Sequence, residues 1–153
     1  MAKAGSLQAE LEIKSPADKF FKVFTNQAHH VPNAASDKVH SVDVHEGDWE
    51  TAGSVKQWEY TIDGKKEIFK EKIEVDEANK SFTMTAVGGH LLEQYKSYKI
   101  IAKVIPKGEG SLLAINIDYE KLKPEDTPPH NYRELVLSIL KDVDTHVMRN
   151  IEI

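Results

Sequence analysis

Residues 45–55 read HEGDWETAGSV, and Lys56 follows them directly. Two glycines, Gly47 and Gly53, close to a serine and a lysine are residue types found in phosphate-binding loops, where backbone N–H groups surround the anion. The Walker form of such a loop ends in Gly-Lys-Ser/Thr and continues into a helix. Here Gly53 is followed by a serine and a strand-like run, so the stretch does not match that form.

The charges within this stretch also disfavour a phosphate. Asp48 and Glu50 lie between the two glycines, and two carboxylates would repel an anion bound there. We therefore predict a plain connection between two strands with Trp49 at its tip. Trp49 is predicted to act as a lid or as a tip that touches membranes, and the alternative is that it anchors the loop.

Acid–base chemistry depends on a single carboxylate in the strand-like region. Glu71 shares its strand parity with Phe69 and Ile73, so its side chain is expected to point into an apolar interior. Burial there would raise its pKa. Hydroxyl groups beside it are expected from tyrosines on the inward face of the strands, namely Tyr60, Tyr98 and Tyr119. The alternative is a carboxylate at a pocket rim, paired with a lysine or with water.

Other kinds of catalytic or metal site find little support in the sequence. We place no lysine on the inward face of the strands, so Schiff-base chemistry is not expected. There is no cysteine and no GxSxG motif, which disfavours a covalent nucleophile. The seven histidines are scattered and form no HExxH motif, so neither a metal nor a cofactor is predicted. Those histidines are His29, His30, His40, His45, His90, His130 and His146.

Composition limits the class of protein. A chain of 153 residues with 40% hydrophobic residues is expected to form one domain, residues 1–153, with a sizeable core. The net charge of −5 argues against binding to nucleic acid or to anionic membranes, so at most transient membrane contact is expected. The absence of cysteine, of an apolar signal core and of a long apolar run predicts a cytoplasmic protein. We expect a monomer or a weak dimer.

The hydrophobic pattern predicts an α+β fold. Alternation in residues 7–14 indicates a strand, and Ser15 and Pro16 then suggest the cap and first residue of a short helix, with a weaker helix near Pro32. Period-two alternation next predicts six strands separated by turn residues, which makes neighbouring strands antiparallel. The strands are expected within 38–46, 54–62, 67–75, 81–87, 95–105 and 111–122.

A helical period returns after Pro128 and Pro129. Apolar residues then recur on one face for some twenty residues, which predicts a long amphipathic helix that covers one face of the sheet. The stripe consists of Tyr132, Leu135, Val136, Ile139, Leu140, Val143, Val147 and Ile151. By pattern alone, the apolar strand faces beneath it favour an ordinary core over a ligand cavity.

This order of elements resembles the helix-grip fold of the birch-pollen-allergen (Bet v I, START-like) superfamily. Four stretches are similar to its major latex protein-like branch: HEGDWETAGSVKQWEY, IDGK before EIFKEKIE, GGHLLEQYKSYK, and DYEKLKPEDTPPHNY before the final helix. The resemblance covers essentially the whole chain. It implies a seven-stranded curved antiparallel sheet gripping a C-terminal helix, two short helices in a V, and a large internal hydrophobic cavity.

The resemblance also implies a function and a set of residues. Family members bind fatty acids, lysolipids, steroids, hormones and other secondary metabolites, and are associated with plant defence and stress responses. We therefore predict a non-enzymatic protein that binds, transports or stores such molecules. The residues expected to contact the ligand are Phe24, Trp58, Tyr60, Phe69, Glu71, Phe82, Met84, Tyr98, Ile100, Leu113, Ile115, Ile117, Tyr119, Ile139, Leu140 and Val143, beside the loop that contains Gly47, Trp49 and Gly53.

Departures from related branches narrow the expectation. The loop lacks the GxGGxGxxK pattern of the class-ten pathogenesis-related proteins, which weakens the case for their ribonuclease activity. The Ser-Gly-Leu-Pro-Ala gate of the abscisic-acid receptors is absent. Two alternatives to a carrier remain: a cyclase or isomerase that uses Glu71 and a tyrosine, and an adaptor that binds proteins through its surface.

Overall fold

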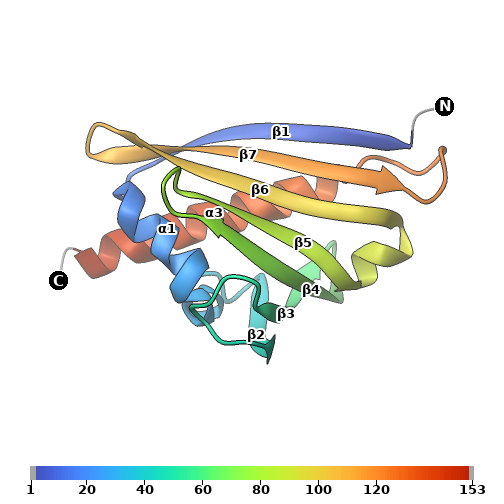
Figure 1. Ribbon diagram of the computed structural model, residues 1–153, viewed down its shortest axis with the longest axis horizontal. Helices are drawn as coiled ribbons and strands as arrows, with labels where there is room; N and C mark the ends of the chain where they lie inside the picture. The colour runs from blue at the N-terminus through green and yellow to red at the C-terminus, as the bar shows by residue number, and fades with distance from the viewer. Residues whose placement is uncertain (1–2, 152–153) are drawn as a thin grey trace.

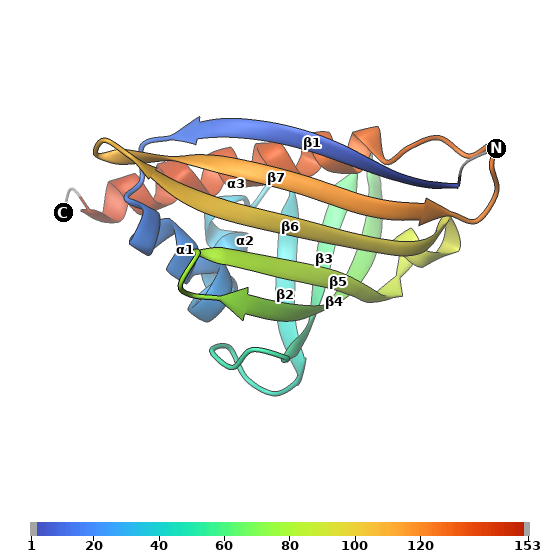
Figure 2. The same ribbon diagram turned by 45° about the horizontal axis from the view of Figure 1, so that its top comes forward.

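The computed structural model describes residues 3–151, which form one antiparallel sheet and its helices (Figures 1 and 2). The sheet has seven strands in the order β1-β7-β6-β5-β4-β3-β2, and every neighbouring pair is antiparallel. The predicted fold class and the predicted strands are confirmed. The strands are β1 (Ala4–Ile13), β2 (Val39–Glu46), β3 (Val55–Ile62), β4 (Lys65–Asp76), β5 (Ser81–Gly89), β6 (Tyr95–Lys107) and β7 (Gly110–Lys121).

The helices cover one face and one end of this sheet. The long helix α3 (His130–Ile151) runs behind β6 and β7 in Figure 1 and behind β1 and β7 in Figure 2. The short helices α1 (Ala17–Asn26), η1 (Ala28–His30) and α2 (Val31–Ala34) lie near the C-terminal end of α3. A further short helix, η2 (His90–Glu93), links β5 to β6.

Two turns show why particular residues are required. The β3–β4 hairpin turns at Asp63 and Gly64, whose φ angles of 50° and 78° fit the two central residues of a tight hairpin turn. Gly89, at the end of β5, has a φ of 102°, and a Cβ atom there would lie 2.1 Å from the carbonyl oxygen of Ile68. Only glycine allows β5 to end this close to β4.

Aromatic side chains join the helical end of the molecule to the sheet. Phe24 of α1 stacks on Phe82 of β5 with ring centroids 5.4 Å apart, and Phe20 lies 5.6 Å from Phe24. Each of these rings is almost fully buried. The apolar face of α1 is therefore part of the same core as the sheet.

The prediction that Ser15 caps α1 is wrong. No side chain caps this helix, and Pro16 occupies the position before its first residue. The Ser15 hydroxyl instead donates to the carboxylate of Asp144 on α3, and the N–H groups of Lys14 and Ser15 donate to the same carboxylate at 3.1 and 2.9 Å. Ser15 is fully buried, so tertiary contact with α3 has replaced the local cap.

The connection at 47–54 is a loop held by hydrogen bonds to its own carboxylate. The Asp48 carboxylate accepts the N–H groups of Glu50 and Thr51 at 2.9 and 2.7 Å and the Thr51 hydroxyl at 3.0 Å. These are the backbone donors that a phosphate would need, and the loop's own carboxylate already holds them. Trp49 is half-buried and packs on His29, with ring centroids 4.8 Å apart. This contact anchors the loop to η1, and the lid function stays a prediction.

The link between the β1–α1 junction and α3 should contribute measurably to stability. We expect Asp144→Ala to lower the free energy of unfolding by about 1–2 kcal/mol, because it leaves buried donors without an acceptor. Asp142→Ala is the matched control on the same helix, because it removes only a half-exposed ion pair with Lys38 and should cost below about 1 kcal/mol. Urea unfolding compares the two, and equal losses would contradict the role given to Asp144.

Candidate ligand-binding cavity

A cavity of about 100 Å³ lies between the sheet and α3. Its wall is apolar, apart from the hydroxyl groups of its tyrosines and the indole N–H of its tryptophan. Eight of the elements described above contribute side chains, so residues far apart in the sequence meet there. The lining residues are Phe24, Val39, Trp58, Tyr60, Phe69, Met84, Leu91, Tyr98, Ile100, Tyr132, Leu135 and Ile139.

Of the residues predicted from the sequence to contact the ligand, one half line the cavity and the other half are buried elsewhere in the core. The cavity wall includes Phe24, Trp58, Tyr60, Phe69, Met84, Tyr98, Ile100 and Ile139. The remaining predicted residues are buried without lining it, namely Glu71, Phe82, Leu113, Ile115, Ile117, Tyr119, Leu140 and Val143. Strand parity identifies the inward face correctly, but it does not distinguish residues that close-pack under α3 from those beside the gap.

Four lining residues are absent from the predicted set. Tyr132 and Leu135 lie on the apolar stripe of α3, which the sequence pattern already identified. That stripe was sufficient to add both residues to the predicted ligand contacts. Val39 begins β2, and Leu91 lies in η2 after two glycines. Nothing in the local pattern around Leu91 indicates its direction, because η2 is too short to show a period.

The cavity is much smaller than the large one that the resemblance implies. Half of its lining residues carry aromatic rings, among them the edge-to-face pair of Phe69 and Tyr98 with centroids 6.1 Å apart. Pockets that hold drug-sized ligands have volumes of about 300–1,000 Å³. A ligand of that size therefore needs these side chains, or α3, to move.

A carboxylate holds two phenols at one end of the cavity. Glu67 accepts the hydroxyl of Tyr132 at 2.6 Å and that of Tyr60 at 3.2 Å, which ties α3 to β3 and β4. Burial raises the pKa of both tyrosines, and the nearby Glu67 raises it further for Tyr132. Both phenols therefore stay protonated and donate hydrogen bonds at neutral pH.

Glu71 is fully buried behind the cavity wall. The indole N–H of Trp58 donates to its Oε1 at 3.2 Å, so Trp58 separates the carboxylate from the cavity. Burial raises the pKa of Glu71 to about 7, although the Trp58 hydrogen bond and the charge of Lys56 act in the opposite direction. The inward direction predicted for Glu71 is confirmed, and its position at a pocket rim is not. Tyr119 lies on β7 and packs on Tyr95 instead of beside Glu71.

The expectation that no lysine points inward is wrong. Lys56 is 1% exposed and stands opposite Glu71 in the β3–β4 ladder. Burial lowers the pKa of its ammonium, and the charges of Glu71 and Asp48 partly offset that effect. Within residues 3–151, neither the Lys56 Nζ nor the Glu71 Oε2 has a hydrogen-bond partner. Lys56 shares its parity with Trp58 and Tyr60, so the signal was present, but a charged side chain is rarely fully buried.

Two further findings concern the described residues alone. None of their helices is long and apolar enough to cross a bilayer. They also contain no group of three or more histidine, cysteine or acidic side chains that could hold a metal ion.

The buried pair should make stability depend on pH. Because the pKa of Glu71 rises from 4.5 to about 7 on folding, the folded state keeps a proton that the unfolded chain releases. The free energy of unfolding therefore falls as pH rises through this window. Lys56→Met removes the cation that limits the pKa shift, so the fall should extend to higher pH.

We expect Lys56→Met to cost about 2 kcal/mol at pH 8 and clearly less at pH 5, because Glu71 is protonated at the lower pH. Combining it with Glu71→Gln should recover most of the loss, since no buried ion then remains without a partner. Urea unfolding at the two pH values measures this. A loss independent of pH, or one that the double variant does not recover, would show that the two side chains are not coupled.

The comparisons with known proteins agree with this geometry. A family model for the pathogenesis-related protein Bet v 1 family matches residues 2–150. MLP-like protein 43 of Arabidopsis thaliana is 40% identical over 147 residues, covering 94% of this chain and 93% of that protein. MLP-like protein 328 of the same plant is 35% identical, covering 97% and 99%. The chain spans only 44% of a third relative there, MLP-like protein 28.

Solved structures show the same relationship. The crystal structure of major latex-like protein 151 from Panax ginseng superposes with a TM-score of 0.90 at 40% identity, covering 94% of this chain and 97% of that one. A point mutant of a Thalictrum norcoclaurine synthase, in complex with a transition-state analogue, has a TM-score of 0.72. Its 18% identity, over 95% of this chain and 97% of that one, shows a shared fold only. The chain belongs to the pathogenesis-related Bet v 1 family, in its major latex protein-like branch.

Proposed function

We propose that this protein binds small hydrophobic or amphipathic molecules in the cavity under α3 and carries or stores them without chemical change. The observation that supports this most is the apolar cavity itself, whose polar groups, other than the hydrogen-bonded Trp58 indole, are phenols. Such a wall offers burial to an apolar body and a few hydrogen bonds to a polar end. Fatty acids, lysolipids, steroids, hormones and plant secondary metabolites have this chemistry.

Burial supplies most of the affinity in this proposal. A ligand that hides about 300 Å² of apolar surface gains about 7 kcal/mol before the entropic costs of association. Before those costs are subtracted the gain is equivalent to a dissociation constant of about 10 μM, which is the tightest binding that this much burial alone supports. Because burial is not directional, such a pocket accepts molecules of related size with little discrimination.

The small cavity adds a requirement for movement. A pocket of about 100 Å³ must enlarge before a steroid or a fatty acid fits. Met84 is flexible enough to change rotamer, and Leu135 and Ile139 are only half-buried on α3. We propose that ligand entry displaces α3 from β3 and β4 and so strains the Tyr132–Glu67 hydrogen bond.

We place this activity in the cytoplasm of plant cells, in defence and stress responses. Native mass spectrometry of the protein taken from its source tissue tests this role directly. A co-purifying small molecule of apolar or amphipathic character is expected. A clean mass of the bare chain would favour the protein-binding adaptor.

Filling the cavity should weaken ligand binding strongly without unfolding the protein. We expect Ile139→Trp to weaken binding of the fluorescent fatty acid cis-parinaric acid at least tenfold, because the larger ring occupies the space that the ligand needs. Thr145→Trp introduces the same ring at an exposed position of α3 and should stay within about twofold of the unchanged protein. Fluorescence titration gives both affinities, and thermal unfolding checks that each variant is folded. Equal binding by both variants would place the ligand outside this cavity.

A second candidate function is a cyclase or isomerase of plant specialised metabolism. It is favoured by the buried carboxylate of Glu71, whose pKa of about 7 suits proton transfer at neutral pH, and by the ammonium of Lys56 facing it. Trp58 separates this pair from the cavity, so catalysis would require its indole to move. The carrier proposal needs no such movement and is therefore preferred.

One variant separates the two candidates. If the protein is an enzyme, Glu71→Gln should abolish turnover of the molecules that bind, with binding itself retained, since the amide cannot exchange the proton. Glu74→Gln changes an exposed residue of the same strand and should have no effect. Mass spectrometry of ligands incubated with each protein detects conversion. A Glu71→Gln protein that differs in affinity alone would exclude the catalytic role.

A further inference from the structure

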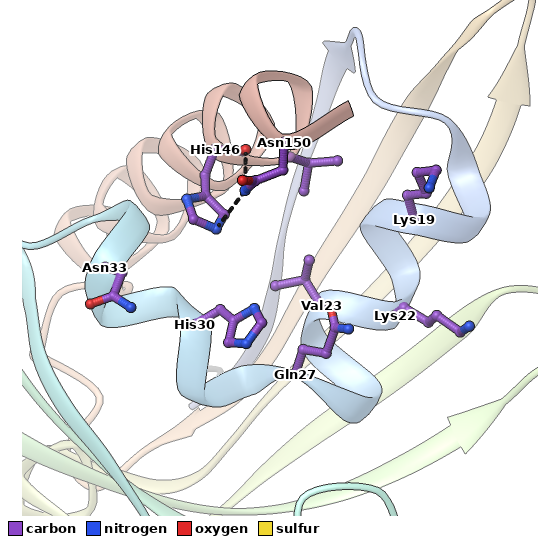
Figure 3. Close-up of a pocket in the computed structure, with 9 residues that line it drawn as sticks. Lys19, Lys22, Val23, Gln27, His30, Asn33, His146 and Asn150 are labelled. Carbon is purple, nitrogen blue, oxygen red and sulfur yellow. Dashed lines mark hydrogen bonds between the residues drawn. The ribbon is translucent and has the colours of Figure 1, made fainter. Parts of the chain in front are cut away.

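A second hollow, of about 560 Å³, lies outside the cavity and shares none of its lining residues. It opens between α1, the short helices η1 and α2, and the last turns of α3 (Figure 3). Its volume falls in the range of pockets that hold small organic ligands, about 300–1,000 Å³. No step of the proposed carrier function uses it.

Four basic side chains line this hollow. Lys19 and Lys22 come from α1, His30 from η1 and His146 from α3. Figure 3 shows the two imidazoles projecting into the space between α3 and η1, and their ring centroids are 6.4 Å apart. Among residues 3–151, the hollow is lined by no carboxylate.

Neutral hydrogen-bonding groups complete the lining. Amides come from Gln27 in the link between α1 and η1, from Asn33 of α2 and from Asn150 of α3. The Asn150 amide donates to the His146 carbonyl oxygen at 3.0 Å, and its nitrogen lies 3.2 Å from Nε2 of the same residue. These contacts hold the His146 ring at the edge of the hollow.

The positive charge of this hollow is local, because the chain as a whole carries −5. The nearest acidic residues of the same helices are engaged elsewhere. Asp18 pairs with Lys80 at 2.8 Å, Asp142 pairs with Lys38 at 2.6 Å, and Asp144 accepts the Ser15 hydroxyl. The two lysines of α1 that line the hollow are paired with none of these carboxylates.

We propose that this hollow binds the phosphate group of a small phosphate monoester. Lysine ammonium groups are common phosphate ligands, and an anion between His30 and His146 would have imidazole donors from η1 and α3 with the lysines of α1 at the rim. Val23 and Val147 are buried at its base and give the organic part of the ester an apolar surface. The two lysines supply charge at the rim, while the imidazoles and amides supply directed hydrogen bonds.

An NMR titration of the full chain with glucose 6-phosphate tests this, with glucose as the matched ligand that lacks phosphate. We expect backbone amide shifts confined to residues 19–33 and 146–150, with a dissociation constant below about 1 mM, and no shifts with glucose. The indole signal of Trp58 should not move, because the central cavity is a separate site. This outcome does not depend on whether the cavity carries a hydrophobic ligand.

Two single variants and a matched control give the test its specificity. Lys22→Gln and His146→Gln should each weaken glucose 6-phosphate binding about tenfold, whereas Lys99→Gln, an exposed lysine of β6, should stay within about twofold. Retained binding of cis-parinaric acid shows that the variants are folded. Shifts spread over surface lysines, or affinities unchanged in both variants, would overturn the proposal.

The same phosphate chemistry can come from a lipid headgroup, so vesicles identify the source. Phosphatidylcholine vesicles are compared with and without phosphatidic acid in a co-sedimentation assay. If the protein sediments only with vesicles that contain phosphatidic acid, and His146→Gln abolishes this, the site binds a lipid headgroup. If the protein binds glucose 6-phosphate but not these vesicles, the site binds a soluble ester. If neither the affinity for glucose 6-phosphate nor the capture by vesicles changes in the variants, the hollow does not bind phosphate.

Discussion

One geometric constraint shapes this protein: a single helix has to cover the apolar face of a seven-stranded sheet. Strands about 4.8 Å apart make such a sheet roughly 29 Å wide, whereas a helix with its side chains is about 10–12 Å across. Helix α3 is therefore too narrow to cover every strand, and the strands whose backbones come closest to it are β1 and β3. Large rings fill much of the space between α3 and the middle of the sheet, and the cavity is the space that those rings leave.

The same constraint explains where the polar groups lie. Beside the cavity, Glu67 draws Tyr60 and Tyr132 together and so joins the sheet to the helix at a place where packing alone is incomplete. At the other end, Asp144 joins α3 to the start of α1. The helix is thus tied by hydrogen bonds near both ends, and its middle rests on apolar contacts that a ligand can replace.

Apart from the Glu67 carboxylate, which holds two phenols at one end, charged groups are separated from the cavity. Lys56 and Glu71 are buried side by side behind Trp58, and the basic hollow lies beyond the end of the sheet, among α1, α2 and α3. An apolar ligand in the cavity therefore meets mainly apolar side chains and phenols. An anion at the hollow meets lysines, imidazoles and amides, so the two sites suit molecules of different chemistry.

The sequence alone determined the order of elements, the inward face of each strand and the family. Alternation along a strand and the helical period after Pro129 are local properties, so they can be read without any knowledge of the partner elements. The inward direction of Glu71 followed from the same alternation. Alternation did not show which of the inward residues line the cavity, because the position of the cavity depends on the distance between α3 and each strand.

Only the tertiary structure decided the size of the cavity, the burial of Lys56 and the hollow at the helical end. Lys56 has inward parity, yet its burial becomes tolerable only because Glu71 comes opposite it in the β3–β4 ladder. The capping role expected of Ser15 was lost because its hydroxyl is directed at the carboxylate of Asp144, 129 residues away, and donates to it. Such contacts join residues that are remote in sequence, and the distance between them is fixed by the packing of α3 on the sheet.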